Sequence, residues 1–207
     1  ILKSELTEVT RGHLSLVFHR FIERKKSPVR IRLNNLLVKP FNPFRTDQDG
    51  FRGLKSKNRK IGSDSIDVSG FILPTRSIDE VKDGVTIWAP QGKNLMDLEG
   101  IYVYRADRII IYGGWLGLAS RSQRVQLARM RVEIGNSVDH LLHLNIAKSQ
   151  VEMPRDLRSG LKEYISELRL EAEREFHNRT VRRIKAGIGE QKKSFIVTDA
   201  TNRGAQM

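Results

Sequence analysis

Residues 100–112 read GIYVYRADRIIIY, two runs of β-branched and aromatic residues on either side of Ala106-Asp107. Such side chains favour strands, and a two-residue break between two runs of this kind is typical of a β-hairpin. We therefore expect antiparallel strands over 101–105 and 108–112. Gly113-Gly114 follows the second run and ends it. This is the most strand-rich part of the sequence.

Alternating apolar and polar residues predict further strands on both sides of this hairpin. Residues 129–134 and 66–72 alternate with the period of two that a half-buried strand requires. Nearer the N-terminus, residues 29–38 alternate around Asn34-Asn35. Because asparagine accepts the positive φ angles of a tight turn, a second hairpin is expected there. The polar stretches 45–60 and 75–99 are expected to be loops.

Two helices are predicted, one towards each end of the chain. Residues 4–24 carry apolar side chains at three- and four-residue spacing, which places them on one face of a helix. Pro154 suits the first position of a second helix. The apolar stripe of that helix runs over 157–184 and spans about eight turns. Gly187 and Gly189 are expected to end it.

The composition combines ordinary hydrophobic content with a strong excess of positive charge. The chain has 207 residues, 37 Lys and Arg against 24 Asp and Glu, a net charge of +13 and no cysteine. The lack of cysteine excludes a disulfide scaffold, a thiol nucleophile and a cysteine-based zinc site, and it agrees with a cytoplasmic location. No apolar run reaches the roughly 18 residues of a transmembrane helix. The positive charge indicates a polyanionic partner, such as nucleic acid, nucleotide phosphates or an acidic surface.

Several familiar catalytic motifs are absent. The sequence has neither the P-loop nor the Rossmann glycine pattern, and it has no nucleophile elbow. The close histidine pairs, His13 with His19 and His140 with His143, lack a third ligand, so no metal site is expected. Glu133 and Asn136 imitate a magnesium-binding box. Their spacing of three differs from the four of that box, and the alternation around Glu133 favours a strand end, with Asn136 or Ser137 capping a short helix.

Seven stretches in a consistent order carry a resemblance to one family. They are residues 17–21, 31–44, 70–74, 100–105, 114–118, 127–132 and 147–149, followed by Pro154 and the long helix. In this order they resemble the second half of a GHKL-type ATPase, the superfamily of gyrase, chaperone, histidine kinase and MutL. Within this superfamily they look most like prokaryotic, MORC-like, chaperone-like ATP-binding proteins. The similarity covers roughly residues 13–185 and depends on the order of all the stretches.

The resemblance implies an α+β fold of the transducer type, with a mixed or antiparallel sheet, a left-handed βαβ crossover and a long C-terminal helix. Residues 1–44 would be a helix and hairpin that close, or hinge to, an ATPase domain missing from this chain. The remaining divisions would be a basic loop over 45–60, the transducer domain over 61–185 and a flexible tail or linker over 186–207. Because the sequence begins at Ile1 and shows no signal-peptide pattern, we expect a segment of a longer protein.

The resemblance also implies a functional lysine. Lys148, in Asn145-Ile146-Ala147-Lys148-Ser149, matches a lysine that contacts the γ-phosphate of ATP, and Ser149 adjoins it. Ile146 stands where MutL has proline, and Ala147 where relatives often have a second lysine. ATP and Mg²⁺ would be bound mainly by the missing domain, so this chain alone should not hydrolyse ATP, and the intact protein would be a homodimer. From the residues alone, without the resemblance, Lys148 reads as one of many solvated lysines.

The basic residues suggest a second role, in contact with DNA. The candidates are Arg52, Lys55, Lys57, Arg59 and Lys60 in the 45–60 stretch, and Arg182 and Arg183 near the end of the long helix. No base-reading motif is present, so such contacts would be directed at the phosphate backbone and sensitive to salt. Two other functions remain open: a free-standing basic nucleic-acid-binding module, and a non-catalytic scaffold or interaction domain. Chaperoning, DNA remodelling, repair and phage defence are all compatible with this class.

Overall fold

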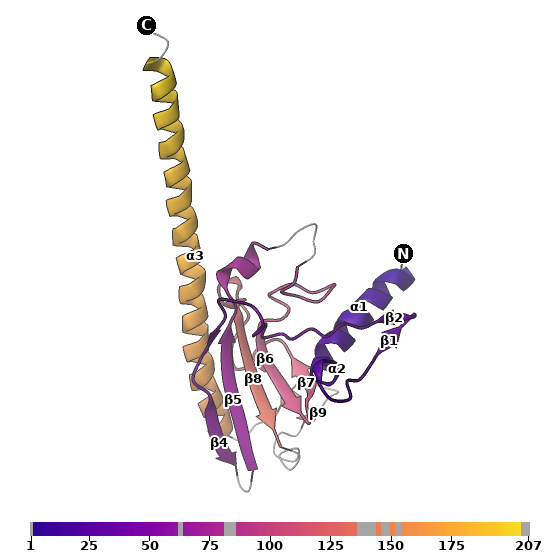
Figure 1. Cartoon of the computed structure of the whole chain (residues 1–207). Coiled ribbons are helices and arrows are strands. Elements are labelled where there is room, and N and C mark those ends of the chain that lie inside the picture. Colours follow the sequence, from indigo (N-terminus) through magenta and orange to yellow (C-terminus); the bar gives the residue numbers. More distant parts are fainter. Residues whose placement is uncertain are drawn as a thin grey trace.

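Over the residues that the structure describes, the chain folds as an α+β protein with three α-helices and a mixed six-stranded sheet (Figure 1). The computed structural model describes residues 2–61, 64–80, 86–135, 144–145, 150–151 and 155–203. The helices are α1 (Leu2–Val17), α2 (His19–Glu23) and α3 (Arg155–Arg203), with short 3-10 turns η1 (Thr75–Ile78) and η2 (Gln123–Val125). The strands are β1 (Arg32–Leu33), β2 (Leu36–Leu37), β3 (Arg52–Gly53), β4 (Lys57–Ile61), β5 (Asp64–Ile72), β6 (Gly100–Arg105), β7 (Arg108–Tyr112), β8 (Ala128–Ile134), β9 (Leu144–Asn145) and β10 (Gln150–Val151).

The six-stranded sheet has β5 and β8 at its centre. β3 and β4 both pair with β5, and the order continues through β8 and β6 to β7. All neighbours are antiparallel except β6 and β8, which run parallel. The hairpin predicted over 101–112 is confirmed as β6 and β7, and its turn residues Ala106 and Asp107 have φ of +45° and +68°. Positive φ at both central residues is the geometry of the tight turn that suits a hairpin.

The two faces of the sheet are covered by different parts of the chain. On one face, α3 packs on the residues of β5, β6 and β8 that point towards it. That core contains Ile66, Val68, Ile72, Ile101, Val103, Met130, Val132 and Ile134, with Leu161, Tyr164, Ile165, Leu168 and Ala172 of α3. On the other face, Tyr102, Tyr104 and Ile109 pack with Leu16 of α1 and with Phe41 and Phe44. Strands that are buried on both faces explain the fully buried run 101–104.

The N-terminal elements also follow the sequence. The helix expected over 4–24 is present as α1 and α2, with a break at Phe18. The second hairpin is present as β1 and β2, which pair antiparallel across Asn34 and Asn35. Both asparagines have positive φ, +49° and +62°, as the turn requires.

The prediction of a loop over 45–60 is wrong for the second part of that stretch. Strands β3 and β4 form there, and the register of β4 places Lys57 opposite Val68 and Arg59 opposite Ile66. The sequence of β4 is rich in charge and lacks apolar alternation, so periodicity could not detect it. The strand forms because its backbone pairs with β5, and a charged strand is typical of a sheet edge, where it discourages further pairing.

The long helix is longer than the sequence predicts. Gly187 and Gly189 do not end α3, which has 49 residues and continues through the expected tail to Arg203. A glycine within a helix costs only about 1 kcal/mol relative to alanine, and residues 190–193 are good helix formers. At about 1.5 Å per residue, α3 is about 74 Å long, and Figure 1 shows its C-terminal part extending well beyond the sheet.

One connection between strands that the resemblance implies is not seen among the described residues. The parallel strands β6 and β8 are joined through β7 and η2, and no α-helix joins two strands of the six-stranded sheet among the described residues, so the left-handed βαβ crossover is not found there. The short helix expected near Ser137 lies outside the described residues. In the described part of the chain, no helix combines the length and the apolarity that crossing a bilayer requires.

Candidate functional site

The segment that carries Lys148 leads directly into α3. Strands β9 and β10 flank it and pair antiparallel, with Asn145 opposite Gln150 and Leu144 opposite Val151. Lys148 and Ser149 themselves lie outside the described residues. Only three residues separate β10 from the first residue of α3. The described part of the candidate site is therefore the set of contacts between α3 and the sheet.

Tyr164 is the first anchor between α3 and the sheet. Its hydroxyl accepts a 2.6 Å hydrogen bond from the backbone N–H of Gly70 in β5 and donates one of 3.1 Å to the carbonyl of Lys55. A Cβ on Gly70 would lie 3.1 Å from this hydroxyl, so glycine is what allows the close approach of helix and strand. One phenol thus satisfies two backbone groups and ties α3 to two segments of the sheet region.

Arg169 is the second anchor, and it is organised around the buried carboxylate of Glu99. Trp115 donates a 2.6 Å bond from Nε1 to Glu99 Oε1, and the backbone N–H of Ser122 donates to Oε2 at 3.2 Å. Arg169 Nη1 lies 3.6 Å from Glu99 Oε1, donates to the carbonyl of Ser120 at 2.6 Å, and its guanidinium lies over the Trp115 ring. Burial raises the pKa of Glu99, and the Trp115 bond partly opposes that rise.

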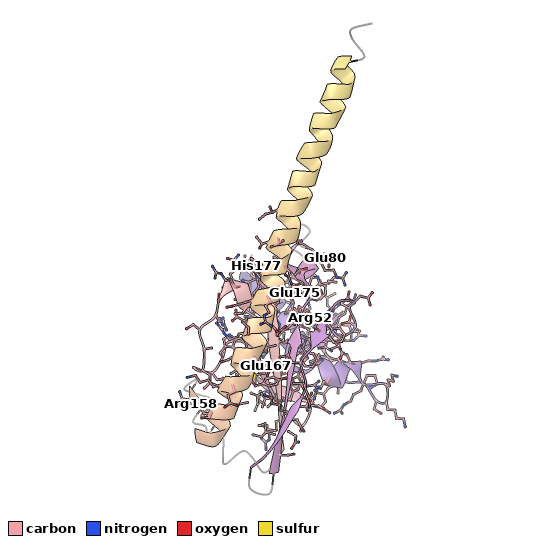
Figure 2. All side chains as sticks on the ribbon, turned by 90° about the vertical axis from the view of Figure 1, so that its left-hand side faces the viewer. Arg52, Glu80, Arg158, Glu167, Glu175 and His177 are labelled. Atoms are coloured by element: carbon pink, nitrogen blue, oxygen red, sulfur yellow. The ribbon has the colours of Figure 1, made fainter. Side chains whose placement is uncertain are left out.

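Ion pairs between the sheet edge and α3 form a third group of contacts. Arg52 lies 3.6 Å from Glu171 and 3.5 Å from Glu175, and Lys57 lies 3.5 Å from Glu167. Figure 2 looks onto α3 and shows Arg52 beside Glu175, with Glu167 nearer the start of the helix. Each pair is partly exposed, so each contributes only a few tenths of a kcal/mol to about 1 kcal/mol.

The contact furthest along α3 joins Arg179 to Asp79, which follows η1. Arg179 Nε donates to Asp79 Oδ2 at 3.0 Å, and Nη2 donates to Oδ1. The pairing raises the pKa of Arg179. This fork-to-carboxylate geometry fixes orientation better than a single point contact. Together with Tyr164 and Arg169, it ties α3 to the sheet region over residues 164–179.

On the opposite face, α2 is joined to the sheet by a chain of charges. Arg20 makes a two-point contact with Glu133 in β8, at 2.6 and 3.1 Å, and reaches Asp107 at 3.3 Å. Arg24 donates to the same Asp107 at 2.8 Å. Hydrogen bonds from these arginines lower the pKa values of Glu133 and Asp107. Glu133 is on a strand, as the alternation predicts, and is engaged by an arginine.

His19 lies beside this chain of charges and is nearly inaccessible. Its Nε2 lies 2.7 Å from the hydroxyl of Tyr104, and its Nδ1 lies 3.2 Å from Glu23. Burial, together with the nearby positive charge of Arg20 and opposed by Asp107, lowers the pKa of His19 to about 4. The ring is therefore neutral at pH 7 and acts as a hydrogen-bonding link between α2 and β6.

The structure does not gather the predicted nucleic-acid residues on one free surface among the described residues. Arg52 and Lys57 are paired with glutamates of α3, while Lys55 is exposed. Arg59 and Lys60 are on β4, and Arg182 and Arg183 are on α3, but their side chains lie outside the described residues. The alternation over 129–134 predicted a strand but no partner for its charged residues. Neither the Arg20–Glu133 contact nor the burial of Glu99 was therefore predicted. The one available signal was the regular spacing of Arg129, Arg131 and Glu133.

Neither sequence similarity to known proteins nor a group of metal ligands identifies a family for this chain. No protein-family model matches the sequence, and no curated protein is similar to it. Within the described residues, no three His, Asp or Glu side chains come together as metal ligands would. The described contacts hold α3 to the sheet region at Tyr164, Arg169 and Arg179.

Proposed function

We propose that this chain is the nucleotide-sensing transducer segment of a larger ATPase of the GHKL type. In this proposal Lys148 contacts the γ-phosphate of ATP held by an ATPase domain, with Mg²⁺, and α3 carries the resulting movement outward. The observation that supports it most is the short connection between β10 and a helix that is anchored at Tyr164, Arg169 and Arg179. The intact protein would act as a homodimer in the cytoplasm.

The chemistry of phosphoryl transfer supports a single lysine in this role. Catalysis of that reaction consists mainly of positioning and of stabilising charge on the phosphoryl oxygens, so one added cation both assists hydrolysis and reports the nucleotide state. Lysine is a compact charge on a flexible stem, which suits contact and release. A rigid helix beginning seven residues after Lys148 would move as a unit with that contact.

The test is ATP hydrolysis by the full-length protein with Lys148→Ala. We expect kcat to fall on the order of a hundredfold, because one transition-state contact is lost, while ATP binding changes much less. Lys162→Ala is the matched control, since Lys162 is exposed on α3 and has no ion pair among the described residues. Unchanged hydrolysis in Lys148→Ala would overturn the sensing role and favour a scaffold function. Stoichiometric ATP binding by the 207-residue chain alone would show that the nucleotide site lies within it.

A second candidate function is contact with nucleic-acid phosphates, and the charge distribution along α3 favours it. Over 155–175 the helix has five basic and six acidic residues, whereas over 176–203 it has seven basic and two acidic ones. The acidic part is the part that packs on the sheet and pairs with Arg52 and Lys57. Binding of a DNA duplex by this chain alone, with an affinity that falls steeply as salt rises, would support this function.

A further inference from the structure

The two edges of the six-stranded sheet differ in character. At one edge lies the charged strand β4, beside α3. At the other lies β7, whose sequence is Arg-Ile-Ile-Ile-Tyr, and among the described residues no strand pairs with its outer side. Figure 1 shows β7 on the side of the sheet away from β4, next to α2. An apolar edge of this kind is where proteins often receive a partner.

A bulge in β7 shapes this edge. Val103 pairs with Ile111 and Tyr104 pairs with Ile109, so Ile110 is the extra residue. A bulge bends an edge strand, interrupts its regular hydrogen bonding and redirects a side chain. Simple addition of another strand is therefore disfavoured here. The half-buried Ile110 packs against the core on the α3 side and also lines a neighbouring hollow.

That hollow is open and has a volume of about 530 Å³. Phe21 of α2 and Ile110 of β7 supply its apolar surface, and Ala106, Arg105 and Arg108 complete it. It has room for one large apolar side chain. Phe21 and Ile110 are far apart in the sequence, and the Arg20 and Arg24 contacts with Asp107 join α2 to the β6–β7 turn beside the hollow.

The charges at the rim of the hollow are positive. Asp107, the one acidic residue of the turn, is already engaged by Arg20 and Arg24. Arg108 is exposed, and its only interaction within the described residues is with the ring of Phe18, 5.3 Å from the guanidinium carbon. Its hydrogen-bond donors are available to a ligand, and a guanidinium of this kind binds carboxylates through two parallel bonds.

We propose that this hollow, called here the β7 hollow (Phe21, Arg105, Ala106, Arg108 and Ile110), binds a short acidic peptide segment of a partner protein. A large aliphatic or aromatic side chain of that segment occupies the space between Phe21 and Ile110. An adjacent carboxylate of the segment pairs with Arg108. The bulge interrupts the regular backbone hydrogen bonding that an added strand would need. Recognition therefore depends on one buried side chain and one charge pair.

The apolar surface favours a peptide over a nucleic acid as the occupant. Nucleic-acid surfaces track phosphates with many cations, whereas here two arginines border an apolar hollow. A peptide with the pattern acidic–apolar–acidic matches both features. This inference is independent of the ATPase proposal, because none of its residues belongs to the Lys148 segment or to the anchors of α3.

The experiment measures fluorescence anisotropy of a labelled peptide that has one leucine flanked by glutamates in a glycine–serine background. The protein is the 207-residue chain. We expect saturable binding that Arg108→Glu weakens by about tenfold or more, as loss of a charge-assisted pair predicts. Arg32→Glu is the matched control, since it makes the same charge change on an exposed residue of β1, and it should leave the affinity within twofold.

Two altered peptides test the apolar and the charged part without changing the protein. Replacing the leucine by serine, or the glutamates by glutamine, should each weaken binding by a similar factor. The proposal is overturned if Arg108→Glu and Arg32→Glu weaken binding equally, which would indicate general charge attraction. It is also overturned if the serine peptide binds as well as the leucine peptide, or if a single-stranded oligonucleotide displaces the peptide at an equal concentration.

Discussion

Arg20 and Glu133 are 113 residues apart in the sequence, yet they form a two-point ion pair at 2.6 and 3.1 Å. The guanidinium also lies 4.0 Å from the centre of the Tyr104 ring. These contacts fix α2 against the end of β8 and the turn between β6 and β7. Glu133 is the last charged residue of β8, so this pair lies at the C-terminal end of that strand.

The first prediction concerns the energy of this pair. In a double-mutant cycle with Arg20→Gln and Glu133→Gln, we expect a coupling of about 1–2 kcal/mol, because the pair is bidentate and partly withdrawn from water. The measurement is urea unfolding followed by circular dichroism. Arg131 also contacts Glu133, at 3.3 Å, so Glu133→Gln alone should cost more than the coupling itself. Coupling near zero would show that the pair does not contribute to holding α2.

The second prediction concerns acid sensitivity through His19. Its folded-state pKa of about 4 is below its ordinary value of 6.5, so below pH 6.5 the unfolded chain binds a proton that the folded chain does not. Stability is therefore present above pH 6.5 and is lost as the pH falls towards 4. Between pH 7 and 4.5, the wild type should lose about 2 kcal/mol more than His19→Gln does.

The comparison with His19→Gln isolates the histidine from its neighbours. Tyr104, Glu23, Arg20 and Asp107 surround it and are retained in both proteins. Urea midpoints measured at half-unit pH steps give the two curves. Parallel curves over this range would contradict a buried neutral His19.

The third prediction tests the contact between α3 and β5 at a glycine. Gly70→Ala adds a Cβ 3.1 Å from the Tyr164 hydroxyl and 3.2 Å from Leu168 Cδ1, closer than such contacts normally are. We expect the free energy of unfolding to fall by about 1–2 kcal/mol, because the helix must shift and weaken the Tyr164 hydrogen bonds. Gly53→Ala is the control, since its Cβ would have no atom within 4 Å, and thermal unfolding should distinguish the two variants clearly.

The fourth prediction tests the Arg179–Asp79 contact by hydrogen exchange. Asp79→Asn removes the charge that Arg179 contacts with two nitrogens, so the helix around residue 179 should open more often. Amide exchange over 173–181, measured by mass spectrometry, should accelerate severalfold, while global stability changes by less than about 1 kcal/mol. Glu173→Gln makes the same change of charge on an exposed face of α3 and should leave exchange unchanged. Equal acceleration in both variants would mean that net charge, and not this contact, controls opening.

The sequence predicted elements whose cause is local. The hairpin at 101–112 follows from β-branched and aromatic runs on either side of a two-residue break, and the Asn34-Asn35 turn follows from the tolerance of asparagine for positive φ. β4 escaped prediction because its pairing with β5, and not its own residue pattern, makes it a strand. The end of α3 escaped prediction because the cost of two glycines is smaller than the helical preference of the residues around them.

The features of the candidate site also fall into two groups, those set by the sequence and those set by the tertiary structure. The sequence by itself determined the strand runs, the excess of positive charge and the position of Lys148 shortly before a long helix, because these depend on residue types and their spacing. Only the tertiary structure decided that Arg52 and Lys57 pair with α3, that Arg20 meets Glu133, and that Phe21 and Ile110 share the β7 hollow. The physical reason is that a charge or an apolar side chain acquires its role from the residue opposite it, and folding brings that residue from a distant part of the chain.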